Sequence, residues 1–160
     1  MRKFFFFSMI FSLLGHFVFA QSDTSQNNPA RSNSHPQAVL IAAFRGDAEG
    51  LKKIITEDTD RDMRDALGRT ALHAAMFQSN IEVIRILIQN GWDINAESTK
   101  NGNTPLHDAV MADNVKAAKL LLEKGADKSI KNKAGLTPMQ AAANDGKREL
   151  VLALMDRKKR

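Results

Sequence analysis

The chain has 160 residues, and its 23 Lys and Arg against 18 Asp and Glu give a formal net charge of +5 at pH 7. That length suffices for one modest domain. The chain has no cysteine, which excludes disulfide cross-links, a thiol nucleophile and thiolate metal ligands, so a folded domain must be held together by packing alone.

The first twenty residues have the layout of a secretory signal peptide. A short basic start, "MRK", precedes the apolar run "FFFFSMIFSLLGHFVFA", and Val18 and Ala20 place small residues just before a cleavage site at Gln21. The apolar run is shorter than the roughly 20 residues that a membrane-spanning helix needs, which favours cleavage over an uncleaved anchor. We therefore expect residues 1–20 to be a signal peptide and the protein to be periplasmic or, alternatively, secreted.

Residues 21–34, "QSDTSQNNPARSNS", have almost no apolar content, and we expect a flexible linker there. The charge beyond residue 20 is uneven, because residues 116–160 carry a net charge of +7 whereas residues 21–65 and 66–115 each carry −2. Such asymmetry is typical of a solvated face, and it also suits binding to an anionic surface.

An internal repeat occupies the rest of the chain. "TALH" at Thr70–His73 matches "TPLH" at Thr104–His107 after 34 residues, and "TPM" at Thr137–Met139 follows after 33 more. The repeat predicts a domain over residues 35–160, divided into four units. Their expected bounds are 35–64, 65–98, 99–131 and 132–160.

Each unit contains two short helical patterns. "IEVIRILIQNG" and "VKAAKLLLEKG" have apolar residues at helical spacing, and Gly91 and Gly125 are placed as helix ends. Thr104 and Pro105 form a helix start, with a hydroxyl cap followed by proline at the first helical position. The sequence therefore predicts an all-α fold of helix pairs.

The segments "GRTALHAA", "GNTPLHDAV" and "GLTPMQAAA" resemble the ankyrin-repeat family, as do "EVIRILIQNGWDIN" and "KAAKLLLEKGAD". The resemblance covers roughly residues 36–157 and implies a solenoid of helix-turn-helix units joined by β-turn fingers. It implies end caps at residues 36–64 and 132–160, with Gln140 where the family's histidine usually stands. It also implies structural roles, with hydrogen bonds between threonine and histidine, for Thr70, His73, Thr104, Pro105, His107, Thr137 and Pro138.

The sequence offers no reactive constellation. Equivalent residues of adjacent units lie about 8–10 Å apart, so His73 and His107 cannot share a zinc ion, whose ligands lie about 2 Å from the metal. Adjacent side chains on a helix diverge by about 100°, so His107 and Asp108 do not face each other as a pair. Residues 58–68 have alternating acids but lack the glycine and closing glutamate of a calcium loop. We expect no enzyme activity, no metal and no cofactor.

The resemblance implies that a protein partner binds the fingers and the exposed face of the first helices. Phe44, Phe77 and Met111 then form an apolar stripe that marks an interaction site, unless it is partly buried by the next unit. Trp92 is either a contact or a lid on a neighbouring loop, and Asp108 is either a contact or bonded to a neighbouring finger. The predicted contact set is Phe44, Arg45, Arg64, Leu67, Arg69, Phe77, Gln78, Trp92, Lys100, Asn103, Asp108, Met111, Lys133, Leu136 and Asn144.

Together these patterns favour an exported, non-catalytic protein that binds another protein. An exported enzyme, such as a peptidoglycan hydrolase that the protein inhibits or protects against, is the favoured partner. The alternative is a surface that binds nucleic acid or an anionic envelope polymer through residues 116–160, although nucleic acid is the less favoured partner. We expect a monomer, with dimerisation through the stripe as the alternative.

Overall fold

The computed structural model describes residues 36–155, so the predicted signal peptide, the predicted linker and the basic tail after residue 155 lie outside the described residues. The described chain is helical, and its helices follow one another in four pairs. In chain order they are α1 (Pro36–Arg45), α2 (Ala48–Ile54), α3 (Ala71–Ala74) with the 3-10 helix η3 (Ala75–Phe77), α4 (Ile81–Gln89), α5 (Pro105–Met111), α6 (Val115–Glu123), α7 (Pro138–Asn144) and α8 (Arg148–Met155).

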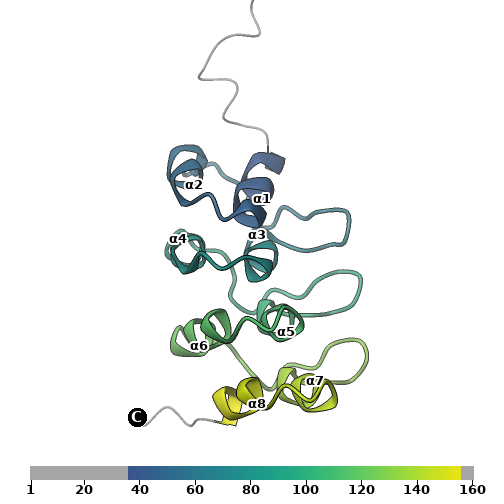
Figure 1. The fold of residues 1–160 in the computed structure, drawn as a ribbon. Coiled ribbons are helices and arrows are strands. Elements are labelled where there is room, and N and C mark those ends of the chain that lie inside the picture. Colours follow the sequence, from purple (N-terminus) through teal and green to yellow (C-terminus); the bar gives the residue numbers. More distant parts are fainter. Residues whose placement is uncertain (1–35, 156–160) are drawn as a thin grey trace, which may run out of the picture. The chain divides into compact units, whose positions relative to one another are not determined.

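The helix pairs stack into two layers. Figure 1 shows α1, α3, α5 and α7 in an inner layer and α2, α4, α6 and α8 in an outer layer. Three loops project on the side of the inner layer, each linking an outer helix to the next inner helix (Figure 1). We call these loops fingers 1, 2 and 3, over residues 55–70, 90–104 and 124–137. The predicted all-α solenoid is confirmed.

Helix starts follow from side-chain caps. Thr104 precedes α5 in an extended conformation, and Pro105 fills the first helical position. A capping box forms because the Thr104 side chain accepts from the His107 backbone N–H and the His107 side chain accepts from the Thr104 backbone N–H. Asn80 and Asn114 cap the outer helices α4 and α6 by accepting hydrogen bonds from backbone N–H groups. Gly91 and Gly125 follow these two helices with φ values of +89° and +93°, a region that favours glycine.

The second unit has a shorter inner helix than the third. The turn after the inner helix contains a left-handed residue in three pairs, namely Gly46 (φ +75°), Asp113 (φ +53°) and Gly146 (φ +69°). Ser79 occupies the same place in the second unit and is not left-handed. The chain there leaves the helix at Gln78, which is extended at φ −130° and ψ 167°.

The core lies between the two layers. Leu72, Leu87, Leu106 and Leu121 are fully buried, and each such side chain contributes roughly 1.5–3 kcal/mol of burial free energy. The buried apolar residues form one continuous cluster from the first pair to the last. None of the helices among residues 36–155 is long and apolar enough to cross a membrane.

Candidate functional site

The two histidines of the repeat motif hold neighbouring units together. His73 Nδ1 lies 2.9 Å from Thr70 Oγ1 and accepts from the Thr70 backbone N–H at 3.2 Å. Because Nδ1 accepts, Nε2 carries the proton, and it donates to the carbonyl oxygen of Asn103 at 2.8 Å. Each ring therefore caps its own helix and reaches the next finger.

His107 repeats this arrangement in the third unit, where Nε2 lies 2.9 Å from the carbonyl oxygen of Leu136. Burial lowers the pKa of His73 to about 4 and also lowers the pKa of His107. Neutral, fully engaged rings have no free position for proton transfer or metal binding near pH 7. Within residues 36–155, no group of three or more His, Asp or Glu side chains is arranged to hold a metal ion.

Gln140 takes the place of histidine in the last unit. Its Oε1 accepts from the Thr137 backbone N–H at 2.9 Å, while its own N–H donates to Thr137 Oγ1 at 3.3 Å. The Gln140 amide thus caps the start of α7 as histidine does in the second and third units, but no hydrogen bond from it to another unit is present among residues 36–155. Pro138 begins α7 and is buried, as is Pro105 at the start of α5.

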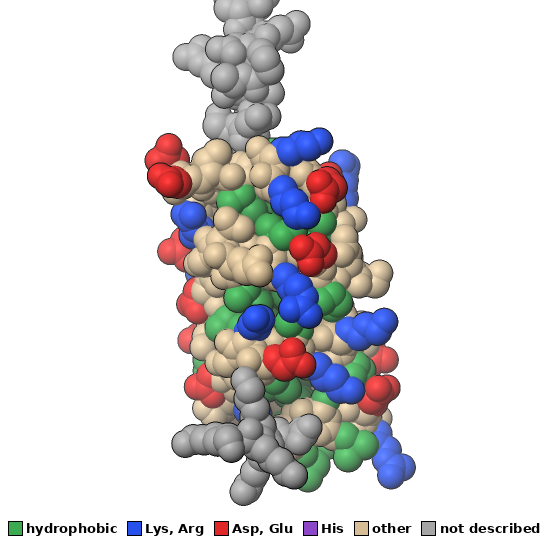
Figure 2. All heavy atoms as spheres, turned by 90° about the vertical axis from the view of Figure 1, so that its left-hand side faces the viewer, with side chains coloured by type: hydrophobic (Ala, Val, Ile, Leu, Met, Phe, Trp, Pro, Cys, Tyr) green, Lys and Arg blue, Asp and Glu red, His purple; other side chains and the backbone are tan. Residues whose placement is uncertain are grey.

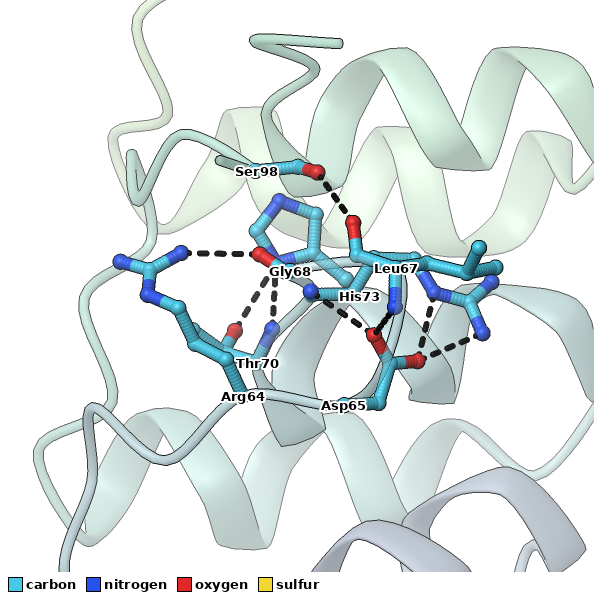
Figure 3. A network of polar contacts seen from close by, with 8 residues as sticks. Arg64, Asp65, Leu67, Gly68, Thr70, His73 and Ser98 are labelled. Atoms are coloured by element: carbon cyan, nitrogen blue, oxygen red, sulfur yellow. Dashed lines mark hydrogen bonds and ion pairs between the residues drawn. The ribbon is translucent and has the colours of Figure 1, made fainter. Parts of the chain in front are cut away.

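Finger 1 is a braced turn rather than a loose loop. The Asp65 carboxylate accepts from the backbone N–H groups of Leu67 and Arg69 at 2.9 Å each and pairs with the Arg69 guanidinium at 2.7 Å. Arg64 donates to the carbonyls of Gly68 and Glu97, and Ser98 Oγ donates to the carbonyl of Leu67 (Figure 3). The second finger is therefore tied to the first.

The apolar stripe stays exposed on the inner layer. Phe44 is 55% exposed on α1, Phe77 is 37% exposed on η3, and Met111 is 54% exposed on α5. The Arg69 guanidinium lies 5.3 Å from the centre of the Phe77 ring, which is a cation–π contact. Arg45, Leu67, Lys100, Lys133 and Asn144 are also exposed, whereas Arg64, Arg69, Gln78 and Leu136 are half-buried.

A shallow pocket lies between the second and third units, where the stripe meets the fingers. It has a volume of about 130 Å³. Six predicted contact residues and one that the sequence analysis missed, Asn101, line it. The lining residues are Leu67, Arg69, Phe77, Lys100, Asn101, Asp108 and Met111.

Asn101 could have been found from the repeat, because it is the third unit's equivalent of Leu67. Its side-chain oxygen accepts from the Asn103 backbone N–H at 3.0 Å, and its carbonyl accepts from the Lys133 backbone N–H at 2.9 Å. Phe44 and the third finger's Lys133 do not line the pocket.

Two predicted contacts, Asn103 and Asp108, are buried instead. Asn103 Nδ2 donates to Asp108 Oδ1, and Asn103 Oδ1 accepts from Asn132 Nδ2, each at 3.0 Å. The interpretation of Asn103 as a surface contact is wrong, because its amide links α5 to finger 3. Asp108 is 2% exposed and bonded to a finger residue, which is the structural alternative, yet it also lies against the pocket.

Trp92 is not available as a contact either. It is 4% exposed and packs in the hydrophobic core, and the Arg61 guanidinium lies 5.8 Å from its ring centre. Arg61 also donates to the carbonyl of Asn90. The large ring therefore acts as a lid under finger 1, which is the alternative left open by the sequence.

Gln78 and Arg64 have bonds within the chain that limit their use as contacts. Gln78 Nε2 donates to the carbonyl of Ala75 at 2.9 Å. Arg64 bridges the first two fingers through the carbonyls of Gly68 and Glu97 at 3.1 and 2.8 Å. Both residues support the neighbouring exposed surface.

The surface of the outer layer carries charges of both signs. Figure 2 shows Lys and Arg interspersed with Asp and Glu over the outer helices, with hydrophobic side chains between them.

Several basic residues of the C-terminal part donate hydrogen bonds to backbone carbonyls within the fold. Lys147 Nζ donates to the carbonyl of Val110 at 2.7 Å, and Lys133 Nζ donates to the carbonyl of Thr99 at 2.6 Å.

Stacked helix pairs, with bonds running from each unit to the next, define a solenoid repeat protein. A family model for ankyrin repeats in three copies matches residues 39–132, which is more than half of the chain. The chain belongs to the ankyrin-repeat family. Ankyrin repeats form a protein–protein interaction module.

Similar stretches occur in much longer proteins. The chain is 37% identical over 51 residues to the mitochondrial liver isoform of glutaminase from Mus musculus, covering 32% of this chain and 8% of that protein. It is 36% identical over 56 residues to the potassium channel AKT1 of Arabidopsis thaliana, covering 35% of this chain and 6% of that protein. It is 36% identical over 61 residues to inversin of Danio rerio, covering 38% of this chain and 6% of that protein. The chain thus spans less than a tenth of these relatives' lengths.

Proposed function

We propose that this protein is an exported, non-catalytic binder whose inner layer and first two fingers hold one protein partner. The observation that carries the proposal is the exposure of Phe44, Phe77 and Met111 at equivalent places of three stacked units. Aromatic and methionine side chains are common anchors of protein interfaces. These three side chains are exposed one above another beside finger 1, whose turn is held by hydrogen bonds, and together they form a rigid apolar surface.

The partner is an exported enzyme, such as a peptidoglycan hydrolase, that the protein inhibits or against which it protects the cell. The signal-peptide pattern of residues 1–20 supports a location outside the cytoplasm, with the periplasm favoured over secretion. A rigid surface that offers an interface but no reactive group of its own suits a blocking role.

The experiment is capture of partners from the exported fraction of the source cells on the immobilised protein. A Phe44→Arg, Phe77→Arg, Met111→Arg variant is compared with a Leu152→Arg control, which places one such charge on an exposed apolar residue of α8. We expect one dominant protein on the parent and the control, and its loss on the triple variant. Circular dichroism checks that all three proteins are equally helical.

The inhibitory part has its own readout. The captured enzyme is assayed with rising amounts of the protein, and we expect its activity to fall to a low plateau at saturation. Full activity at saturation would contradict inhibition but leave the interface in place. Capture that is equal on the triple variant would move the interface away from the inner layer.

A further inference from the structure

The pocket between the second and third units is lined by a buried carboxyl group with one unpaired oxygen. Asp108 Oδ1 accepts from Asn103 Nδ2 at 3.0 Å, but no donor among residues 36–155 reaches Asp108 Oδ2. The side chain is almost completely buried and lies against the pocket. An unpaired buried oxygen of this kind destabilises the fold, so it requires an explanation.

The neighbouring units have no carboxylate at this place. Ala74 and Ala141 stand at the equivalent positions of the second and fourth units, and Ala74 is also buried. Asp108 is therefore a departure from the repeat that adds an unpaired oxygen. Burial raises the pKa of Asp108 to about 6, which reflects the cost of its negative charge.

The charged residues around Asp108 make no hydrogen bond to its buried Oδ2. Arg69 acts on Asp108 through its charge, but its guanidinium pairs with Asp65 at 2.7 Å and lies over the Phe77 ring. Lys100 also lines the pocket and is exposed. Arg69 and Asp65 form a pair of their own, so the lone unpaired oxygen at the pocket is an acceptor for an incoming donor.

The rest of the pocket suits the stem of a long side chain. Leu67, Phe77 and Met111 supply apolar walls, and the aliphatic stems of lysine and arginine pack on such surfaces while the head remains polar. A volume of about 130 Å³ is close to that of an engineered cavity of about 150 Å³ that admits benzene, so the space accepts one side chain.

We propose that this pocket receives one lysine or arginine side chain of the partner protein, whose cationic head donates to Asp108 Oδ2. The inference rests on the proposed function, because it names the feature of the partner that the inner layer selects. Charge-assisted hydrogen bonds are the stronger class, and this one replaces an unpaired oxygen. The pocket thereby makes binding depend on one cationic residue of the partner.

The proposal implies a pH dependence that involves named groups. A bound cation favours ionised Asp108, so binding below about pH 6 must first release the Asp108 proton. Affinity then falls about tenfold for each further pH unit. Asp65 and Arg69 form the paired charges beside this carboxyl, and Lys100 is the exposed charge that lines the pocket.

The first test uses small probes on the purified protein and needs no partner. N-acetyl-arginine N-methylamide is titrated and followed by the backbone amide ¹H–¹⁵N signals of Leu67 and Asn101, which line the pocket in every variant. The citrulline analogue, which has the same shape but no charge, is titrated beside it. We expect saturable binding of the arginine probe, at least about tenfold tighter than the citrulline probe. Asp108→Asn should abolish it, because the amide would turn an N–H group to the pocket, while Leu152→Ala should not change it.

Equal binding of both probes, binding that survives Asp108→Asn, or no saturable binding would each overturn the proposal. Asp108→Ala, which copies Ala74 and Ala141, is the second variant and should also lose the probe. Thermal melts establish that both variants are folded.

The captured partner then separates this inference from the proposed function. Loss of the partner on the Phe77→Arg variant, with full affinity on Asp108→Asn, would refute the cationic pocket and leave the interface intact. Probe binding that depends on Asp108, with no protein partner captured, would refute the proposed function and leave the pocket intact.

Discussion

Two kinds of buried titratable residue respond to pH in opposite ways in this fold. Burial lowers the pKa of His73 and His107, so both rings are neutral near pH 7, whereas burial raises the pKa of Asp108 to about 6 against the hydrogen bond from Asn103. Through the histidines the fold loses stability as pH falls, and through Asp108 it loses stability as pH rises. Both effects can be tested by single substitutions.

His73→Gln should make the protein less sensitive to acid. The folded-state pKa of His73 is lowered to about 4, so its contribution is complete above the unfolded value of 6.5 and is lost as pH falls through about 4. Full loss corresponds to roughly 3 kcal/mol. Glutamine keeps the local cap, as Gln140 does beside Thr137, but does not titrate.

Urea unfolding at about pH 7 and about pH 5 measures this effect. Near neutrality, we expect His73→Gln to lower the free energy of unfolding by about 1 kcal/mol, because it loses the bond to Asn103. Between the two pH values, its free energy of unfolding should fall by less than that of the parent. The same fall in both proteins would show that His73 does not carry the acid response.

Asp108→Asn should stabilise the protein at neutral and alkaline pH. The folded-state pKa of Asp108 is raised to about 6, so the stability of the parent is greatest below the unfolded value of 3.8 and falls as pH rises through about 6. We expect a gain of about 1–3 kcal/mol near pH 8 that vanishes near pH 4. A variant that is less stable than the parent near pH 8 would contradict an unpaired charge at this position.

The elements of the fold were largely predictable from the sequence. The Thr-Pro starts, the glycine ends and the 33-residue step give the helix pairs, because capping and helix termination depend on nearby residues. Side-chain neighbours across units depend on residues about 30 positions away. The burial of Trp92, the bond between Asn103 and Asn132 and the unpaired oxygen of Asp108 therefore appear only in three dimensions.

Polar side chains at the starts of two outer helices bond to the end of the inner helix in the preceding unit. Asn80 Nδ2 donates to the carbonyl of Gly46 at 2.8 Å, and Asn114 Nδ2 donates to the carbonyls of Met76 and Gln78 at 3.0 and 2.9 Å. Asn114 Oδ1 also accepts from the Ala117 backbone N–H at 3.0 Å. Asn114 thus caps its own helix and also hydrogen-bonds the carbonyl groups at the end of the second unit's inner helix.

Substitutions at Asn114 separate these two roles. Asn114→Asp keeps a capping oxygen, as Asp47 supplies for α2, but loses both donors to the second unit. We expect it to lower the free energy of unfolding by about 1 kcal/mol, and Asn114→Ala, which also loses the cap, by about 2 kcal/mol. Chemical denaturation measures both, and an Asn114→Asp protein as stable as the parent would mean that only the cap matters.

At the scale of the whole molecule, the two layers offer different surfaces to a partner. The inner layer has the apolar stripe and the braced fingers, and the outer layer has interspersed charges (Figure 2). A partner held mainly by the stripe should bind with modest dependence on salt. An anionic polymer bound through the basic residues after 115 should lose affinity steeply as salt rises.

Calorimetric titration of the captured partner at low and high salt distinguishes these cases. We expect affinity to change by less than about tenfold, because few charges are released when apolar side chains are buried. A steep linear fall of log affinity with log salt would favour the basic surface instead.

The most direct test of an inner-layer interface is the affinity of the captured partner for three forms of the protein. These are the parent, the Phe44→Arg, Phe77→Arg, Met111→Arg variant and the Leu152→Arg control. An inner-layer interface predicts that the triple variant loses at least about 3 kcal/mol of binding free energy, more than a hundredfold in affinity, while the control keeps the parent's value. Equal affinity of all three forms would contradict the claim that this face binds the partner.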